Sequence, residues 1–197
     1  MITLLQGKKL IKIARDSISA AFSGKNIQVG KDVKEEFSDV LGVFVTLNKD
    51  GQLRGCIGFP EGAYPLYNGV IEAARSAAFS DPRFPSLGKD ELDYITVEVS
   101  VLTKPMRVIV RDPDDYFKEI KVGRDGLIVR GTFNSGLLLP QVAVEYKWNS
   151  KTFLEQTCVK AGLPRNVWQD FDQCSVYRFQ SQVFSEISPN GEVKQLM

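Results

Sequence analysis

An arginine and a cysteine two residues apart are the strongest candidates for chemistry in this sequence. Arg54 and Cys56 lie in the segment Leu-Arg-Gly-Cys-Ile-Gly, residues 53–58, which has the pattern of an extended strand. Side chains two apart in a strand point to the same side, about 6–7 Å apart along the chain. A guanidinium beside a thiol favours the thiolate, the nucleophilic form of cysteine. Cys56 is therefore a candidate catalytic nucleophile; the alternatives are a contact residue in a binding pocket and a small apolar core residue.

Other polar residues could complete a site around this thiol. Glu98, on the outward side of a neighbouring predicted strand, is a candidate proton acceptor if it faces the same cleft. In the structural alternative, Arg54 pairs with Glu98 or Asp81 and holds two parts of the chain together. Gln141 follows a proline and could bind a polar ligand or cap a turn. The candidate binding residues are Arg54, Gly58, Asp81, Arg83 and Gln141.

The composition excludes several kinds of catalysis. The 197 residues contain no histidine, which removes Ser-His, Cys-His and histidine–metal schemes. The three cysteines, Cys56, Cys158 and Cys174, form no Cys-X-X-Cys motif, and their odd number argues against a disulfide framework. Carboxylates do not cluster at the spacing of metal ligands. We expect neither a metal nor a cofactor.

Charge and hydrophobicity narrow the class of protein further. The chain has 25 basic and 24 acidic residues and a net charge of +1, which argues against nucleic-acid binding. No apolar run approaches the roughly 20 residues that span a bilayer. Lysines and an arginine interrupt the apolar pattern of the N-terminus, as no signal-peptide core would allow. We expect a cytoplasmic globular protein without a membrane anchor.

A β-hairpin is expected to position the Arg54–Cys56 segment. The turn at residues 48–51 suits a three-residue loop with a glycine bulge. The expected cross-strand pairs are Asn48 with Gln52, Phe44 with Cys56, and Gly42 with Gly58. One face of this hairpin is wholly apolar and comprises Leu41, Val43, Val45, Leu47, Leu53, Gly55, Ile57 and Phe59. Arg54, Cys56 and Gly58 then point away from the main core, and the glycines either admit a ligand or let backbones pack closely.

The remaining pattern is α+β with mostly antiparallel pairing. Periodicity predicts helices over residues 4–22 and 65–79, a short helix over 112–120, and a helix that begins at Asn149 or Ser150 and ends at Gly162. Strands are predicted within residues 91–102 and over 126–130, 136–139 and 176–184. Residues 24–36 have no clear period and are predicted to form a loop with at most a short helical turn.

Several motifs in order along the chain carry a family resemblance. They include residues 53–58, Asp81-Pro82-Arg83-Phe84, the strand at 98–102, Gly126-Leu127-Ile128 and the segment 138–143. Trp148, Phe153-Leu154, Lys160-Ala161-Gly162-Leu163 and Phe184-Ser185-Glu186 continue the series. Over nearly its whole length the sequence resembles the AMMECR domain family in its stand-alone archaeal or bacterial form. Some relatives have histidine before the glycine that matches Gly126, where this chain has Asp125.

The resemblance implies a fold, a set of partners and two alternatives for function. The fold would be a single AMMECR-type domain over residues 1–197, with a larger sheet-and-helix portion, a smaller α/β portion and the Cys56 motif near a cleft between them. Genes of this family lie beside, or are fused to, those of Memo-like proteins and radical S-adenosylmethionine enzymes. The resemblance thus favours a binding or substrate-presenting module that acts with those partners on an unknown small molecule. The alternative is a cysteine-dependent enzyme or redox-active protein that uses Cys56.

Overall fold

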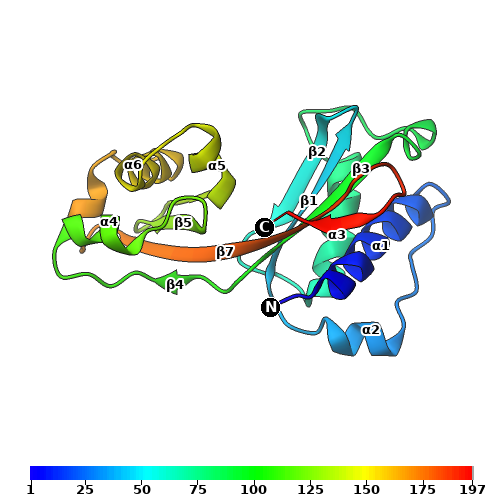
Figure 1. Ribbon diagram of the computed structural model, residues 1–197, viewed down its shortest axis with the longest axis horizontal. Coiled ribbons are helices and arrows are strands. Elements are labelled where there is room, and N and C mark those ends of the chain that lie inside the picture. Colours follow the sequence, from blue (N-terminus) through cyan, green and yellow to red (C-terminus); the bar gives the residue numbers. More distant parts are fainter. Residues whose placement is uncertain (197) are drawn as a thin grey trace. The chain divides into compact units, whose positions relative to one another are not determined.

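The computed structural model describes residues 1–196, which form two compact units (Figure 1). The first unit comprises Met1–Leu102 and the chain from Gln182 onward, and the second comprises Thr103–Ser181. Strand β7 (Ser175–Glu186) runs from the second unit into the first and belongs to the sheet of each. The α+β class with an antiparallel sheet, predicted from the sequence, is confirmed.

In the first unit, two long helices pack on one face of a sheet. The strands lie in the order β2 (Gln52–Phe59), β1 (Gly42–Lys49), β3 (Ile95–Leu102) and β7, and β8 (Val193–Gln195) pairs with β7 on its other side. Helices α1 (Leu4–Ala21) and α3 (Leu66–Phe79) contact each other and the sheet, while α2 (Lys31–Glu36) and a 3₁₀ turn at Lys89–Glu91 lie in connections. The core includes Leu10, Ala14 and Ile18 of α1, Val70, Ala74 and Ala77 of α3, and Val43, Val45, Val97 and Val99 of the sheet.

The second unit has a smaller sheet and a separate core. Its strands lie in the order β6 (Ser135–Leu138), β5 (Asp125–Arg130) and β7, with β4 (Met106–Arg107) on the other side of β7. Its helices are α4 (Tyr116–Glu119), α5 (Pro140–Glu145) and α6 (Ser150–Lys160), with 3₁₀ turns at Pro113–Asp115 and Val167–Gln169. Buried Leu127, Val129, Phe153, Leu154, Trp168 and Val176 form the centre of this core.

Capping residues fix the ends of α1 and α6, and for α6 they are residues that the sequence predicts. The Thr3 hydroxyl accepts the Gln6 N–H and the Gln6 side chain accepts the Thr3 N–H, which forms a capping box before α1. Asn149 accepts the Thr152 N–H and begins α6, and Gly162, with φ of 71°, follows its end. The short elements β4, α5 and β8 were not predicted, because two to six residues give little periodic signal.

The β1–β2 hairpin differs from its predicted register. Asp50 and Gly51 form a two-residue loop in which both residues have positive φ, 52° and 75°, as a type I′ turn requires. Thr46, and not Phe44, lies opposite Cys56, and Phe44 lies opposite Gly58. The register shifts between Leu47 and Asn48, which compensates for the shorter loop. On the side of this shift away from the turn, the residues of both strands therefore lie on the faces that were predicted for them. The predicted loop and pairs are therefore wrong, and so is the burial of Leu53, which is 42% exposed.

No helix within residues 1–196 combines the length and the apolarity that crossing a bilayer demands.

Candidate functional site

The candidate site is a face formed by side chains from three neighbouring strands. Cys56 on β2 lies opposite Thr46 on β1, which in turn lies opposite Glu98 on β3. The next row across the same strands is Gly58, Phe44 and Ser100. We call these six residues the Cys56 face. Because side chains alternate along a strand, it is the side of the sheet opposite the one that carries Val43, Val45 and Leu47.

Cys56 is half-buried, and its thiol is held in the protonated form. Burial raises the pKa of Cys56, and the nearby carboxylates of Glu98 and Asp81 act in the same direction. A hydrogen bond from Thr46 Oγ1 to the sulfur, 3.2 Å long, and the charge of Arg83 oppose this rise without cancelling it. The environment therefore does not produce the thiolate that the sequence interpretation required.

Arg54 is engaged away from the thiol. Its Nε donates to Glu91 Oε1 at 3.1 Å and its Nη2 to Oε2 at 2.8 Å, while Nη1 donates to the Pro85 carbonyl at 2.9 Å. Hydrogen bonds from Arg54 and from the Gly88 N–H lower the pKa of Glu91 to about 2. The expected pairing of Arg54 with Glu98 or Asp81 is thus wrong. Arg54 fastens the loop before β3 to the hairpin.

Asp81 and Arg83 cover the open edge of β2 at Cys56. The buried Asp81 carboxylate accepts the Cys56 N–H at 2.9 Å and the Arg83 guanidinium at 2.7 and 3.0 Å. Arg83 Nη2 also donates to the Cys56 carbonyl at 3.2 Å. The Arg83 side chain holds the pKa of Asp81 well below its usual range. The pair therefore satisfies both main-chain groups of an edge residue, a common way to protect a sheet edge.

Glu98 and Gln141 are less firmly engaged than the other candidates. Burial raises the pKa of Glu98, and two strand spacings, about 10 Å, separate its strand from that of Cys56. Gln141 belongs to the second unit, where its Oε1 is buried and accepts no hydrogen bond from the described residues. Asp125, at the place of the histidine found in some relatives, is buried and accepts bonds from the Arg124 side chain and the Lys121 N–H.

The glycines of the hairpin serve close packing. A Cβ at Gly55 would lie 2.1 Å from the carbonyl oxygen of Ala77 on α3. A Cβ at Gly58 would lie 2.3 Å from the Val43 carbonyl oxygen and 2.4 Å from the Phe44 ring, and one at Gly42 would lie 2.3 Å from the Pro60 carbonyl oxygen. These glycines could either admit a ligand or let backbones pack closely, and the short distances support close packing. The Phe44 ring fills the space beside Gly58.

Sequence reasoning missed two residues of this region. Thr46 contacts the thiol directly, and Glu91 binds Arg54, Lys49 and the Gly88 N–H. The correct hairpin register would have revealed Thr46, whereas Glu91 is 37 residues from Arg54 and gives no local signal. Within residues 1–196, no group of three or more Cys, Asp or Glu side chains is placed to hold a metal ion.

Comparison with known proteins identifies the family. The sequence model of the family described as AMMECR1 matches residues 11–184. The chain belongs to the AMMECR1 family. A Methanothermobacter thermautotrophicus protein is 52% identical over 182 residues, which cover 92% of this chain and 94% of the relative. Protein MJ0810 of Methanocaldococcus jannaschii is 45% identical over 98% of this chain and 96% of its own length.

A solved AMMECR1 relative has the same fold. The crystal structure of the uncharacterized protein PH0010 from Pyrococcus horikoshii matches with a TM-score of 0.89 and 46% sequence identity, over 98% of each chain. The match covers both units and every candidate residue lies inside the range of the family model. The resemblance drawn from the motifs is therefore confirmed at the level of family and fold.

Proposed function

We propose that this AMMECR1 protein is a binding module that presents the Cys56 face to a partner and does not use the thiol in turnover. The supporting observation is that both arginines near Cys56 already have structural partners: Arg54 binds Glu91, and Arg83 binds Asp81. A protonated thiol, the Phe44 ring and the Glu98 carboxyl group, whose side chain has no hydrogen-bond or ion-pair partner within residues 1–196, are left to offer contacts, but no activated nucleophile. Such a mixture of apolar and hydrogen-bonding groups suits recognition.

For the partners, we propose a Memo-like protein and a radical S-adenosylmethionine enzyme of the same cytoplasm. The gene association implied by the family resemblance supports this choice. In this scheme the Cys56 face docks on one of these proteins, or holds a small molecule that the radical enzyme modifies. The chain itself contributes positioning, since its thiol remains protonated and the nearby Asp81 carboxylate is held by Arg83 and the Cys56 N–H.

A pull-down from the native organism tests this proposal. The tagged wild-type chain is compared with Cys56→Ser and Glu98→Gln, which change the face conservatively, and with Lys31→Gln, which alters an exposed side chain on α2. Mass spectrometry is expected to identify the Memo-like and radical enzymes with wild type and Lys31→Gln, and to find less of them with the two face variants. Absence of both partners at micromolar concentration contradicts the proposal.

The cysteine-dependent enzyme remains the second candidate because of one observation. Cys56 is half-buried, whereas Cys158 and Cys174 are buried, and both Thr46 and Arg83 act to lower its pKa. The rate at which iodoacetamide alkylates Cys56 distinguishes the binding module from the cysteine-dependent enzyme.

A further inference from the structure

The first unit contains a second potential site, separate from the Cys56 face. A cavity of about 570 Å³ lies between α1 and the segment that joins β7 to β8. Its volume is within the range of small-molecule sites, about 300–1,000 Å³. None of the residues that line it belongs to the Cys56 face.

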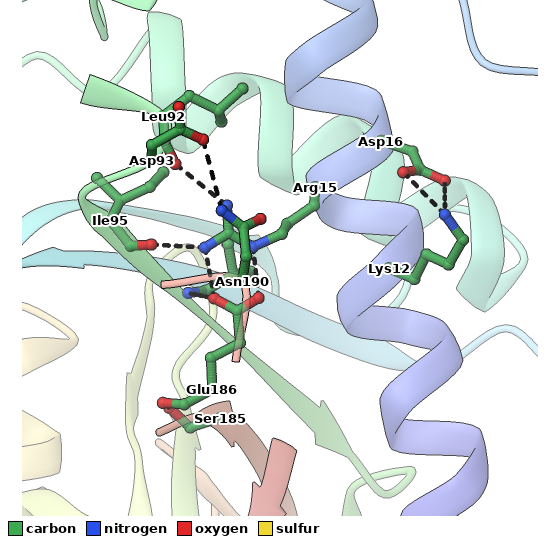
Figure 2. A network of polar contacts seen from close by, with 10 residues as sticks. Lys12, Arg15, Asp16, Leu92, Asp93, Ile95, Ser185, Glu186 and Asn190 are labelled. Atoms are coloured by element: carbon green, nitrogen blue, oxygen red, sulfur yellow. Dashed lines mark hydrogen bonds and ion pairs between the residues drawn. The ribbon is translucent and has the colours of Figure 1, made fainter. Parts of the chain in front are cut away.

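The floor of the cavity is a buried ion pair, drawn in Figure 2. Arg15 binds the Glu186 carboxylate through Nε and, at 2.6 Å, through Nη2. Nη2 also donates to the Ile95 carbonyl at 2.5 Å and Nη1 to the Leu92 carbonyl at 3.2 Å. These four bonds use four of the five N–H groups of a guanidinium. The fifth, on Nη1, has no partner among the described residues.

The two walls of the cavity carry opposite charges. Lys8 and Lys12 lie one turn apart on α1, and Asp93, Asn190 and Glu192 line the facing side. Lys12 pairs with Asp16, which lies on the same helix and also lines the cavity. Among the described residues, the Asp93 side chain accepts one hydrogen bond, from the Asn190 amide at 3.5 Å (Figure 2). Within residues 1–196, no ion pair joins the lysine wall to the acidic wall. Lys8 on one wall and Asp93 and Glu192 on the other are therefore available to a molecule that spans the cavity, whereas the Lys12 charge is shared with Asp16.

We propose that this cavity binds a small zwitterion of about the size of a dipeptide. Its carboxylate would meet Lys8 and the fifth N–H of Arg15, and its ammonium group would meet Asp93 and Glu192. The acidic wall would repel a purely anionic ligand, and the lysines would repel a purely cationic ligand, because like charges disfavour each other. A zwitterion satisfies both walls at once.

Nuclear magnetic resonance titration of the full chain tests the site with defined probes. L-alanyl-L-alanine carries both charges, its N-acetyl derivative lacks the ammonium group, and its C-terminal amide lacks the carboxylate. We expect saturable shifts of the amide resonances around the cavity with the dipeptide, at millimolar affinity. Each singly charged derivative is expected to bind about five-fold more weakly, the size of one exposed charge contact. Absence of saturable shifts up to about 20 mM dipeptide, a range that covers millimolar dissociation constants, overturns the proposal, as does equal binding of all three probes.

Matched variants locate the binding. Lys8→Gln and Glu192→Gln remove one exposed charge from each wall and leave the Arg15–Glu186 pair intact. Each is expected to weaken dipeptide binding about five-fold. Lys31→Gln and Glu35→Gln remove an exposed pair of the same type on α2 and should leave the affinity unchanged. If the α2 variants weaken binding as much as the cavity variants do, the assignment to this cavity is wrong.

Discussion

Cys56 lies among groups that act on its thiol in opposite directions. Burial and two carboxylates raise its pKa, while the Thr46 hydroxyl and Arg83 lower it, and burial is the largest of these effects. The sequence placed an arginine two residues away and suggested the reverse balance. The difference arises because Arg54 points its guanidinium at Glu91. Which carboxylate an arginine selects depends on tertiary contacts that spacing along a strand does not encode.

The first prediction concerns the rate at which iodoacetamide alkylates Cys56. Since the thiolate is the reacting form and the pKa of Cys56 is raised, we expect Cys56 to react more slowly than free cysteine at pH 7, and its rate to level off at a higher pH than that of free cysteine. Thr46→Val removes a hydrogen bond that lowers the pKa, so it should slow the reaction further. Mass spectrometry distinguishes the Cys56 peptide from those of the buried Cys158 and Cys174. Alkylation faster than that of free cysteine at pH 7 would instead support the enzyme.

The second prediction concerns Glu91, whose pKa is lowered to about 2 in the folded chain. A carboxylate with a depressed folded pKa stabilises the fold above its unfolded pKa, about 4.3, and loses that contribution as the pH falls through 2. Glu91→Gln should therefore lower the free energy of unfolding by about 2 kcal/mol at pH 7, as expected for hydrogen bonds to a charged group. Urea unfolding should show this difference shrinking between about pH 4 and pH 2. A difference that stays constant over this range would show that the Arg54–Glu91 pair contributes nothing through its charge.

At the scale of elements, the β1–β2 hairpin shows which features a sequence can determine. Alternation of apolar residues correctly separated the buried face from the face of Cys56. The loop was predicted with three residues, because a two-residue loop reverses the parity of the strands. The chain instead combines a two-residue turn with an irregularity at Leu47 and Asn48. These two departures compensate each other from Gly55 onward and change only the burial of Leu53 near the turn, so the alternation of apolar residues cannot reveal them.

The third prediction concerns the contact between β2 and α3. Gly55→Ala would place a methyl group 2.1 Å from the Ala77 carbonyl oxygen, and neither backbone can retreat without disturbing the core. We expect a loss of about 3 kcal/mol in the free energy of unfolding, measured by urea titration. The matched control is Gly69→Ala on α3, where the nearest atom is a Val43 methyl at 3.1 Å. Because alanine has a higher helix propensity than glycine, the gain offsets this contact. The free energy of unfolding of Gly69→Ala should therefore stay within about 1 kcal/mol of the wild-type value. Similar losses in both variants would contradict this account.

At the scale of the whole molecule, two separate cores divide the chain. Amphipathic periodicity predicted the long helices and most of the strands of both units, and family motifs predicted that two portions would exist. The sequence did not predict that β7 would belong to both units. This strand was expected over residues 176–184, whereas it runs from Ser175 to Glu186. Those last residues bring Glu186 to Arg15, 171 positions away, a contact that no sequence pattern indicates.

The fourth prediction concerns this buried ion pair. The Glu186 side chain is 3% exposed and that of Arg15 12%, and Glu186 also accepts the Val97 N–H. Glu186→Gln leaves a buried guanidinium without its counter-charge, which should cost about 3–5 kcal/mol of stability. Urea unfolding followed by circular dichroism measures the loss. Glu35→Gln, which breaks an exposed pair with side chains 91% and 70% accessible, should change stability by less than about 0.5 kcal/mol. Equal effects of the two substitutions would contradict the structural importance of the buried pair.

Binding of a partner to the Cys56 face can be measured by calorimetric titration. The purified chain is titrated with each of the two proposed partners, a Memo-like protein and a radical S-adenosylmethionine enzyme. We predict micromolar or tighter binding to at least one of them, weakened about ten-fold by Glu98→Gln or Cys56→Ser, the scale of a central interface contact, and unchanged by Lys31→Gln. No heat of binding to either protein at about 10 µM, a concentration that detects micromolar affinity, would contradict the proposal, as would equal binding of wild type and both face variants.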